Sequence, residues 1–140
     1  MQSETNTLSR TRVKAGNILI YLLGSLLVIM AAAKLAHVPQ LASQLAVLGF
    51  GGSRLILVGA LEVVSALLFM IPAARSFGLL LLTAFLGGAV SAHVAHGEVP
   101  FQPVFMIGMI WLAAWLRHPE ILWSLSDSSL PAARLAQGSN

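Results

Sequence analysis

The sequence predicts an all-α integral membrane protein in which four transmembrane helices form a small bundle. Hydrophobic residues make up 57% of the 140 residues, well above the share found in soluble domains. Only 9% of the residues are charged, which is too few to cover a core of this size with a water-facing surface. The hydrophobic residues also occur in long runs separated by proline, glycine and single basic residues. Such runs are typical of helices that cross about 30 Å of hydrocarbon.

The first span is predicted over residues 15–36, after a polar segment, residues 1–14, that is interpreted as a flexible cytoplasmic tail. At 1.5 Å per residue the apolar run is long enough to cross the bilayer, and Pro39 ends it. A secretory signal peptide is the alternative, with alanines 31–33 as cleavage-site residues. The apolar core of a signal peptide is about 7 to 15 residues long. This run is longer and three more hydrophobic segments follow, so a membrane span is favoured.

The next three elements are a surface helix and two spans. Residues 40–48 are mildly amphipathic and too short to cross, so a short helix on the membrane surface is predicted there. Spans two and three are predicted over residues 54–71 and 76–96, ended by Pro72 and Gly97. Because their connection is tight, these two helices are expected to be antiparallel neighbours.

The fourth span is predicted over residues 100–116, which is short for a bilayer. Proline is tolerated in the first turn of a helix, so Pro100 and Pro103 fit its start. The tryptophans toward its end favour the lipid headgroup level; they are Trp111, Trp115 and Trp123. Residues 118–140 are predicted to form a cytoplasmic tail.

The basic residues predict that both chain ends lie in the cytoplasm. With the N-terminus inside, six of the eight Lys and Arg residues fall on the cytoplasmic side, as the positive-inside rule requires. The six are Arg10, Arg12, Lys14, Arg75, Arg117 and Arg134, and the two on the outside are Lys34 and Arg54. These cations are scattered singly and form no patch, so no nucleic-acid partner is expected.

Three polar side chains inside the predicted spans are the candidate site: Lys34, Glu62 and His93. A charge at the centre of a membrane helix costs roughly 2.5 to 3.5 kcal/mol and usually faces the bundle interior or a polar cavity. The predicted topology brings all three to the outer half of the bundle. One interpretation is a buried Lys34–Glu62 ion pair that fixes helix register, with His93 as a hydrogen-bonding neighbour. The other is a pocket open to the outer leaflet that handles a proton, a polar head or a quinone carbonyl.

The neighbours of these residues predict how the helices meet. The face around Glu62 is narrow, which predicts that another helix approaches it closely; it contains Val58, Gly59, Ser65 and Ala66. A second seam of small residues recurs at every fourth position of span three and predicts close packing there too; it runs through Ala84, Gly88, Ala92 and His96. His96 is included in the candidate polar cluster.

Other site chemistries have little support. Cysteine is absent, which excludes thiolate catalysis and disulfides. His93, His96 and Glu98, with Glu62 or His37, offer no third ligand at a fixed spacing, so no metal site is predicted. No nucleophile with a base and no phosphate-binding loop is found, so no catalytic residue is assigned.

The chain resembles the DoxX-like family of small four-helix membrane proteins over about residues 15–117. Three segments carry the resemblance: KLAHVPQ at 34–40, LVGALEVVSALLF at 57–69 and LGGAVSAHVAHG at 86–97. The resemblance implies a four-helix bundle with Lys34, Glu62 and His93 at the family's polar positions. It also implies a link to quinone-coupled or redox-stress membrane complexes, although many members have no assigned activity.

Three functions remain open. The first is a membrane subunit of a redox system that binds a lipophilic small molecule, such as a quinone, alone or beside a redox partner protein. The second is a proton-coupled carrier of small solutes that uses Glu62. The third is a non-catalytic assembly or chaperone-like membrane protein in which the polar cluster serves only packing. The expected location is the bacterial inner membrane as a multi-pass protein. The lipid bilayer is one expected partner, and the other is either a redox partner protein or further copies of the chain in a homo-oligomer.

Overall fold

Residues 2–119 are described by the computed structural model, with side chains from residue 10 onward, and within this part of the chain all regular structure is helical. The predicted cytoplasmic tail beyond residue 119, with Trp123 and Arg134, lies outside the described residues. The helices are α1 (Gln2–Leu35), α2 (Pro39–Val47), α3 (Ser53–Met70), α4 (Arg75–Ala95) and α5 (Phe101–Arg117).

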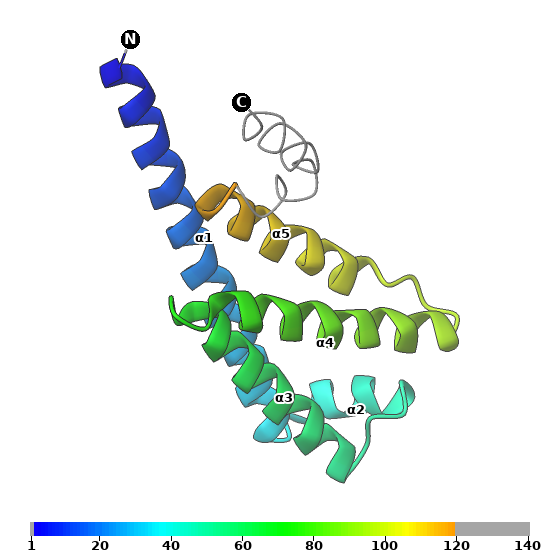
Figure 1. The fold of residues 1–140 in the computed structure, drawn as a ribbon. Helices are drawn as coiled ribbons and strands as arrows, with labels where there is room; N and C mark the ends of the chain where they lie inside the picture. The colour runs from blue at the N-terminus through cyan, green and yellow to red at the C-terminus, as the bar shows by residue number, and fades with distance from the viewer. Residues whose placement is uncertain (1, 120–140) are drawn as a thin grey trace, which may run out of the picture.

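The N-terminal segment differs from the prediction. Residues 2–14 were expected to be a flexible tail, but they form the first turns of α1 and continue without a break into the apolar part of that helix. Starting a helix is its costly step, whereas extending an existing one costs little. A polar segment without proline or glycine can therefore extend a long helix, and α1 projects beyond the other helices (Figure 1).

The remaining helix ends follow the proline and glycine positions. Pro39 is the first residue of α2, where its missing N–H is not needed. The end of α3 at Met70 lies two residues before Pro72, and Pro100 immediately precedes α5. Gly97, just after α4, has a φ of 73°, a conformation that glycine adopts without strain. Spans two and three of the prediction match α3 and α4 to within one residue.

Three helices are long and apolar enough to cross a membrane: residues 10–35 of α1, then α3 and α4. The fourth apolar helix, α5, has 17 residues and is therefore about 25 Å long, somewhat shorter than the hydrocarbon layer. Many large apolar side chains on these helices point outward, which suits a lipid environment.

The four long helices form a closed ring in which each packs against two others. Helix α1 contacts α3 and α5, and α4 contacts the same two helices. In Figure 1, α4 and α5 run antiparallel to each other and cross the α1 and α3 pair obliquely. The helices converge where α3 turns into α4 and α5 ends, which we call the closed end. They diverge at the open end, where α1 leads into α2 and α4 leads into α5.

Two glycines allow the close approach at the closed end. A Cβ on Gly78 of α4 would lie 2.2 Å from the backbone nitrogen of Phe69 in α3. A Cβ on Gly16 of α1 would lie 2.9 Å from the backbone nitrogen of Arg117 in α5. Both distances are shorter than any ordinary contact, so only glycine fits at these crossings. The apolar core lies inside the ring and includes Ile20, Leu27, Ala66, Phe69, Leu82, Met106 and Ile110.

Candidate functional site

A buried ion pair joins α1 and α3 near the open end. The Lys34 Nζ atom donates a hydrogen bond to the Glu62 Oε2 atom. Lys34 is 8% exposed and Glu62 is 3% exposed, so bulk water solvates neither charge well and each depends on the other. The predicted pair is therefore confirmed. It links residues that are 28 positions apart in the sequence, so it depends on the packing of the two helices.

The face of α3 that carries Glu62 packs as predicted. Gly59, Ser65 and Ala66 are buried beside Glu62. A Cβ on Gly59 would lie 3.3 Å from the backbone oxygen of Ala31 in α1. The small residues thus let α1 approach closely, and this approach brings the Lys34 side chain within reach of the carboxylate.

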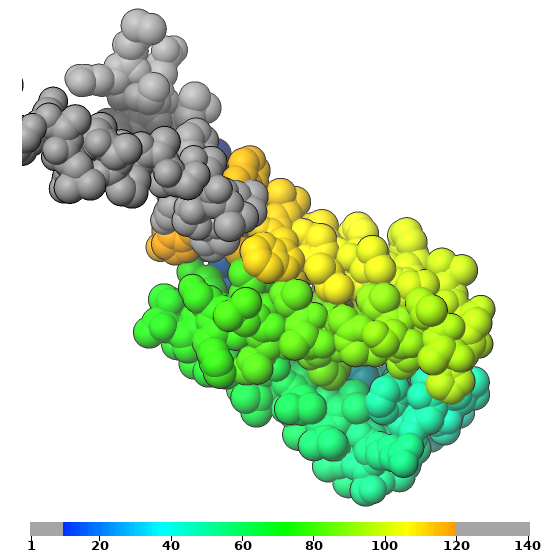
Figure 2. Space-filling model, turned by 45° about the vertical axis from the view of Figure 1, so that its right-hand side comes forward, coloured from blue at the N-terminus to red at the C-terminus, as the bar shows by residue number. Residues whose placement is uncertain are grey.

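The ion pair forms part of the wall of a cavity of about 760 Å³ at the open end. All five helices contribute to the lining, which is mostly apolar. The volume and the apolar lining are typical of pockets for small molecules, which span about 300 to 1,000 Å³. In the space-filling view, α1 is visible at the bottom of the gap between α2 and α4 (Figure 2). The polar lining residues are Lys34, Gln44, Glu62, His93, Glu98 and Gln102.

His93 lines this cavity together with the ion pair. Its Nδ1 atom lies 2.8 Å from the backbone oxygen of Ala89, one turn earlier on α4. Its Nε2 atom lies 3.9 Å from the Glu98 carboxylate. The sequence predicted His93 as a hydrogen-bonding neighbour of the pair. The structure brings it to the same cavity, but the described polar contacts of its ring are with the Ala89 backbone oxygen and, at 3.9 Å, the Glu98 carboxylate.

His96 lies apart from the other three candidate residues. It is exposed, and its Nδ1 atom contacts the backbone oxygen of Ala92 at 2.8 Å. It is not among the residues that line the cavity. His96 is the C-cap residue of α4, one position beyond Ala95, the last helical residue, so the chain leaves the helix there and the imidazole lies outside the cavity wall.

The small-residue seam of α4 was interpreted wrongly. Close packing against a helix was expected along it, but Ala84, Gly88 and Ala92 line the cavity instead. A Cβ on Gly88 would meet no atom within 4 Å. The same lack of bulk that could admit a neighbouring helix here leaves empty space.

Arg75 has a structural role that the sequence did not reveal. It was predicted as a cytoplasmic loop cation, but it is the first residue of α4 and is buried. Its Nε atom donates to the backbone oxygen of Phe69 at 3.2 Å, and its Nη2 atom lies 3.4 Å from the backbone oxygen of Met70. Arg75 thus satisfies carbonyl groups at the end of α3, which have no partners within that helix.

The arrangement suits binding better than metal chemistry. Among the described residues, no three His, Asp or Glu side chains converge on a point that could hold a metal ion. The cavity instead offers an apolar space with an ammonium, two carboxylates, an imidazole and two amides in its wall. These groups can donate or accept hydrogen bonds with a polar head while the apolar lining holds the rest of a molecule.

Comparison with known proteins agrees with the helical architecture. The family model described as the DoxX-like family matches residues 18–116. No curated protein and no solved structure matches the chain. The match includes α3, α4, nearly all of α5 and the second half of α1, and it contains Lys34, Glu62 and His93. With these apolar helices and this match over most of its length, the chain is a multi-pass membrane protein that belongs to the DoxX-like family.

Proposed function

We propose that this protein binds a lipophilic small molecule with a polar head, such as a quinone, in the open-end cavity, and that it acts as a membrane subunit of a redox system. The observation that carries the proposal is the buried Lys34–Glu62 pair in the wall of an otherwise mostly apolar cavity. A carbonyl or hydroxyl head would bond to this pair and to His93. The apolar part would lie against α2 and α4.

The proposal includes a membrane topology. All four long helices cross the bilayer, and both chain ends face the cytoplasm of a bacterial cell, in its inner membrane. The closed end carries Arg75 and Arg117, which supports its cytoplasmic placement. The cavity then opens toward the outer leaflet. A short α5 is compatible with spanning, because a bilayer thins locally around a short helix at modest cost.

Mass spectrometry of organic extracts tests the binding. Wild-type protein, extracted gently from the membrane, is expected to carry a lipid or quinone that Glu62→Gln has lost. Ser65→Ala is the matched control, because Ser65 is also buried on α3 but bonds only to the backbone oxygen of Leu61. Identical extracts from wild type and Glu62→Gln would contradict the proposal.

A second pair of variants tests the cavity itself. Gly88 lines the cavity and Gly87 does not, although both have open space where a Cβ would lie. Gly88→Leu is expected to fill part of the cavity and displace the bound molecule, whereas Gly87→Leu adds the same side chain elsewhere on α4 and leaves binding unchanged. Equal retention in the two variants would argue that the molecule binds elsewhere.

A non-catalytic assembly role is the alternative, favoured by one observation. Lys34 and Glu62 satisfy each other's charges, so the pair can be explained by packing alone. Under this alternative, replacing both residues with apolar ones of similar volume preserves folding and phenotype.

A proton-coupled carrier that uses Glu62 would instead lose transport in proteoliposomes when the pH gradient is removed.

A further inference from the structure

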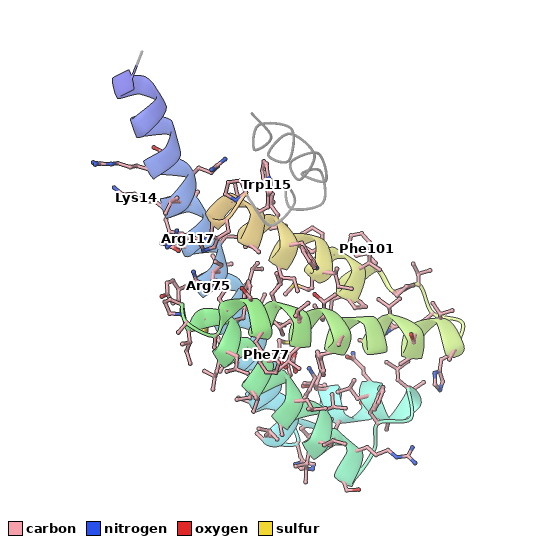
Figure 3. The ribbon with its side chains drawn as sticks, in the orientation of Figure 1. Lys14, Arg75, Phe77, Phe101, Trp115 and Arg117 are labelled. Atoms are coloured by element: carbon pink, nitrogen blue, oxygen red, sulfur yellow. The ribbon has the colours of Figure 1, made fainter. Side chains whose placement is uncertain are left out.

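The closed end gathers four cations from three helices. Figure 3 shows Lys14 on α1, Arg75 at the start of α4 and Arg117 at the end of α5 on the same side of the molecule. Arg12 lies on α1, one turn before Gly16, whose backbone meets that of Arg117. Arg75 is close enough to Arg117 for their like charges to interact.

Two of these guanidinium groups have a buried donor without an acceptor. The Nε atoms of Arg12 and Arg117 are shielded from water, and neither has a hydrogen-bond partner in the described structure. A buried donor left unpaired is unfavourable, and more so when it is charged. The described carboxylates, Glu62 and Glu98, both belong to the cavity at the open end. Within residues 10–119, no acid therefore balances the closed-end cations.

The surroundings indicate what kind of anion would complete this site. Exposed apolar side chains lie on α4 and α5 just beyond the cations, among them Phe77, Leu80 and Leu112. Trp115 is 37% exposed and sits beside Arg117 near the end of α5, as aromatic residues do at the headgroup level. A ligand with phosphate oxygens at the cations and acyl chains on these helix faces fits both features.

We propose that the closed end is a binding site for the phosphate of an anionic phospholipid, held by Arg12, Lys14, Arg75 and Arg117. On binding, the Arg12 and Arg117 side chains turn their guanidinium groups toward the phosphate, whose oxygens accept their hydrogen bonds, and the exposed Lys14 ammonium adds a further charge. Arg75, already bonded to the end of α3, contributes mainly its positive charge. This site is separate from the open-end cavity and independent of what that cavity binds.

Native mass spectrometry of the full chain in detergent tests the proposal, with phosphatidylglycerol and phosphatidylcholine of the same acyl chains as probes. Wild type is expected to bind phosphatidylglycerol roughly tenfold more tightly than phosphatidylcholine. Arg12→Gln and Arg117→Gln are each expected to reduce that preference several-fold. Arg54→Gln is the matched control, because Arg54 is an exposed arginine at the open end that bonds to the backbone oxygen of Gly49.

Each outcome decides between the lipid and its competitors. Equal binding of the two lipids by wild type would overturn the proposal whether or not the variants fold. Displacement of phosphatidylglycerol by an equal concentration of inorganic phosphate would also overturn it and identify a site for a free anion. An equal loss of preference in Arg54→Gln would show that net charge, and not this cluster, attracts the lipid.

Discussion

Replacing Lys34 and Glu62, singly and together, measures how strongly the buried pair couples α1 to α3. Lys34→Met leaves a carboxylate that is 3% exposed, and Glu62→Met leaves an ammonium that is 8% exposed. Neither remaining charge has another described charged partner. Breaking a buried pair costs about 3 to 5 kcal/mol, and membrane insertion of a lone charge costs about 2.5 to 3.5 kcal/mol. Each single change is therefore expected to lower the free energy of unfolding by about 3 kcal/mol.

The double variant is expected to behave differently. Two methionines of similar volume leave no charge to desolvate, so the double change should cost no more than about 1 kcal/mol or should stabilise the bundle. The coupling between the two sites would then be several kcal/mol, whereas independent sites add to within about 0.5 kcal/mol.

Unfolding of the purified protein by sodium dodecyl sulfate in mixed micelles, followed by far-UV circular dichroism, measures these free energies. Ser65→Ala serves as the control for a buried polar side chain of α3 whose described hydrogen bond, to the backbone oxygen of Leu61, stays within the helix. If the cost of the double variant equals the sum of the two single costs, the charges do not stabilise each other and the reasoning fails. Ligand retention by a folded double variant then separates the two proposed functions, since binding requires the pair and packing does not.

Three further predictions concern other parts of the bundle. Gly78→Ala places a Cβ 2.2 Å from the backbone of α3 and should cost about 3 kcal/mol in the same unfolding assay, whereas Gly108→Ala, with open space around it, should be neutral or slightly stabilising; similar costs for the two would contradict the close crossing. Trp111→Phe removes an N–H that lies 3.1 Å from the Thr83 hydroxyl and should cost about 0.6 kcal/mol, an average for hydrogen bonds between membrane helices. In a protein that already carries Thr83→Val, the same Trp111→Phe change should cost nothing further, and an equal cost in both backgrounds would contradict the hydrogen bond. His96→Ala should leave the amount of bound molecule in extracts unchanged, because His96 is exposed outside the cavity. Loss of the bound molecule from this variant would show that the site extends to the end of α4.

The helices and the ion pair could be predicted because hydrocarbon allows few other arrangements of these residues. Prolines and glycines mark the ends of the apolar runs, and backbone groups in hydrocarbon require helices. A lysine and a glutamate at one depth have few other partners in a membrane. The predicted boundaries of the α3 and α4 spans and the Lys34–Glu62 contact follow from these restrictions.

Features that depend on how helices tilt were not predictable. The spacing of Ala84, Gly88 and Ala92 shows that one face of α4 is small, but it cannot show whether a helix or empty space lies opposite. The oblique crossing of α3 and α4 at Gly78 decides this, because helices that meet at an angle at the closed end diverge at the open end. The position of Arg75 likewise depends on the turn between α3 and α4, which directs its side chain back toward the end of α3.

Helix α2 has a consequence for how a molecule could enter. It forms one wall of the cavity, yet none of its residues is buried. Residues with positive φ flank it, namely His37 on one side and Gly49 and Gly52 on the other. Displacing α2 would therefore break little of the packing that keeps the four long helices together. Substitutions in this short helix could therefore change which small molecule the cavity selects while the free energy of unfolding of the bundle stays the same.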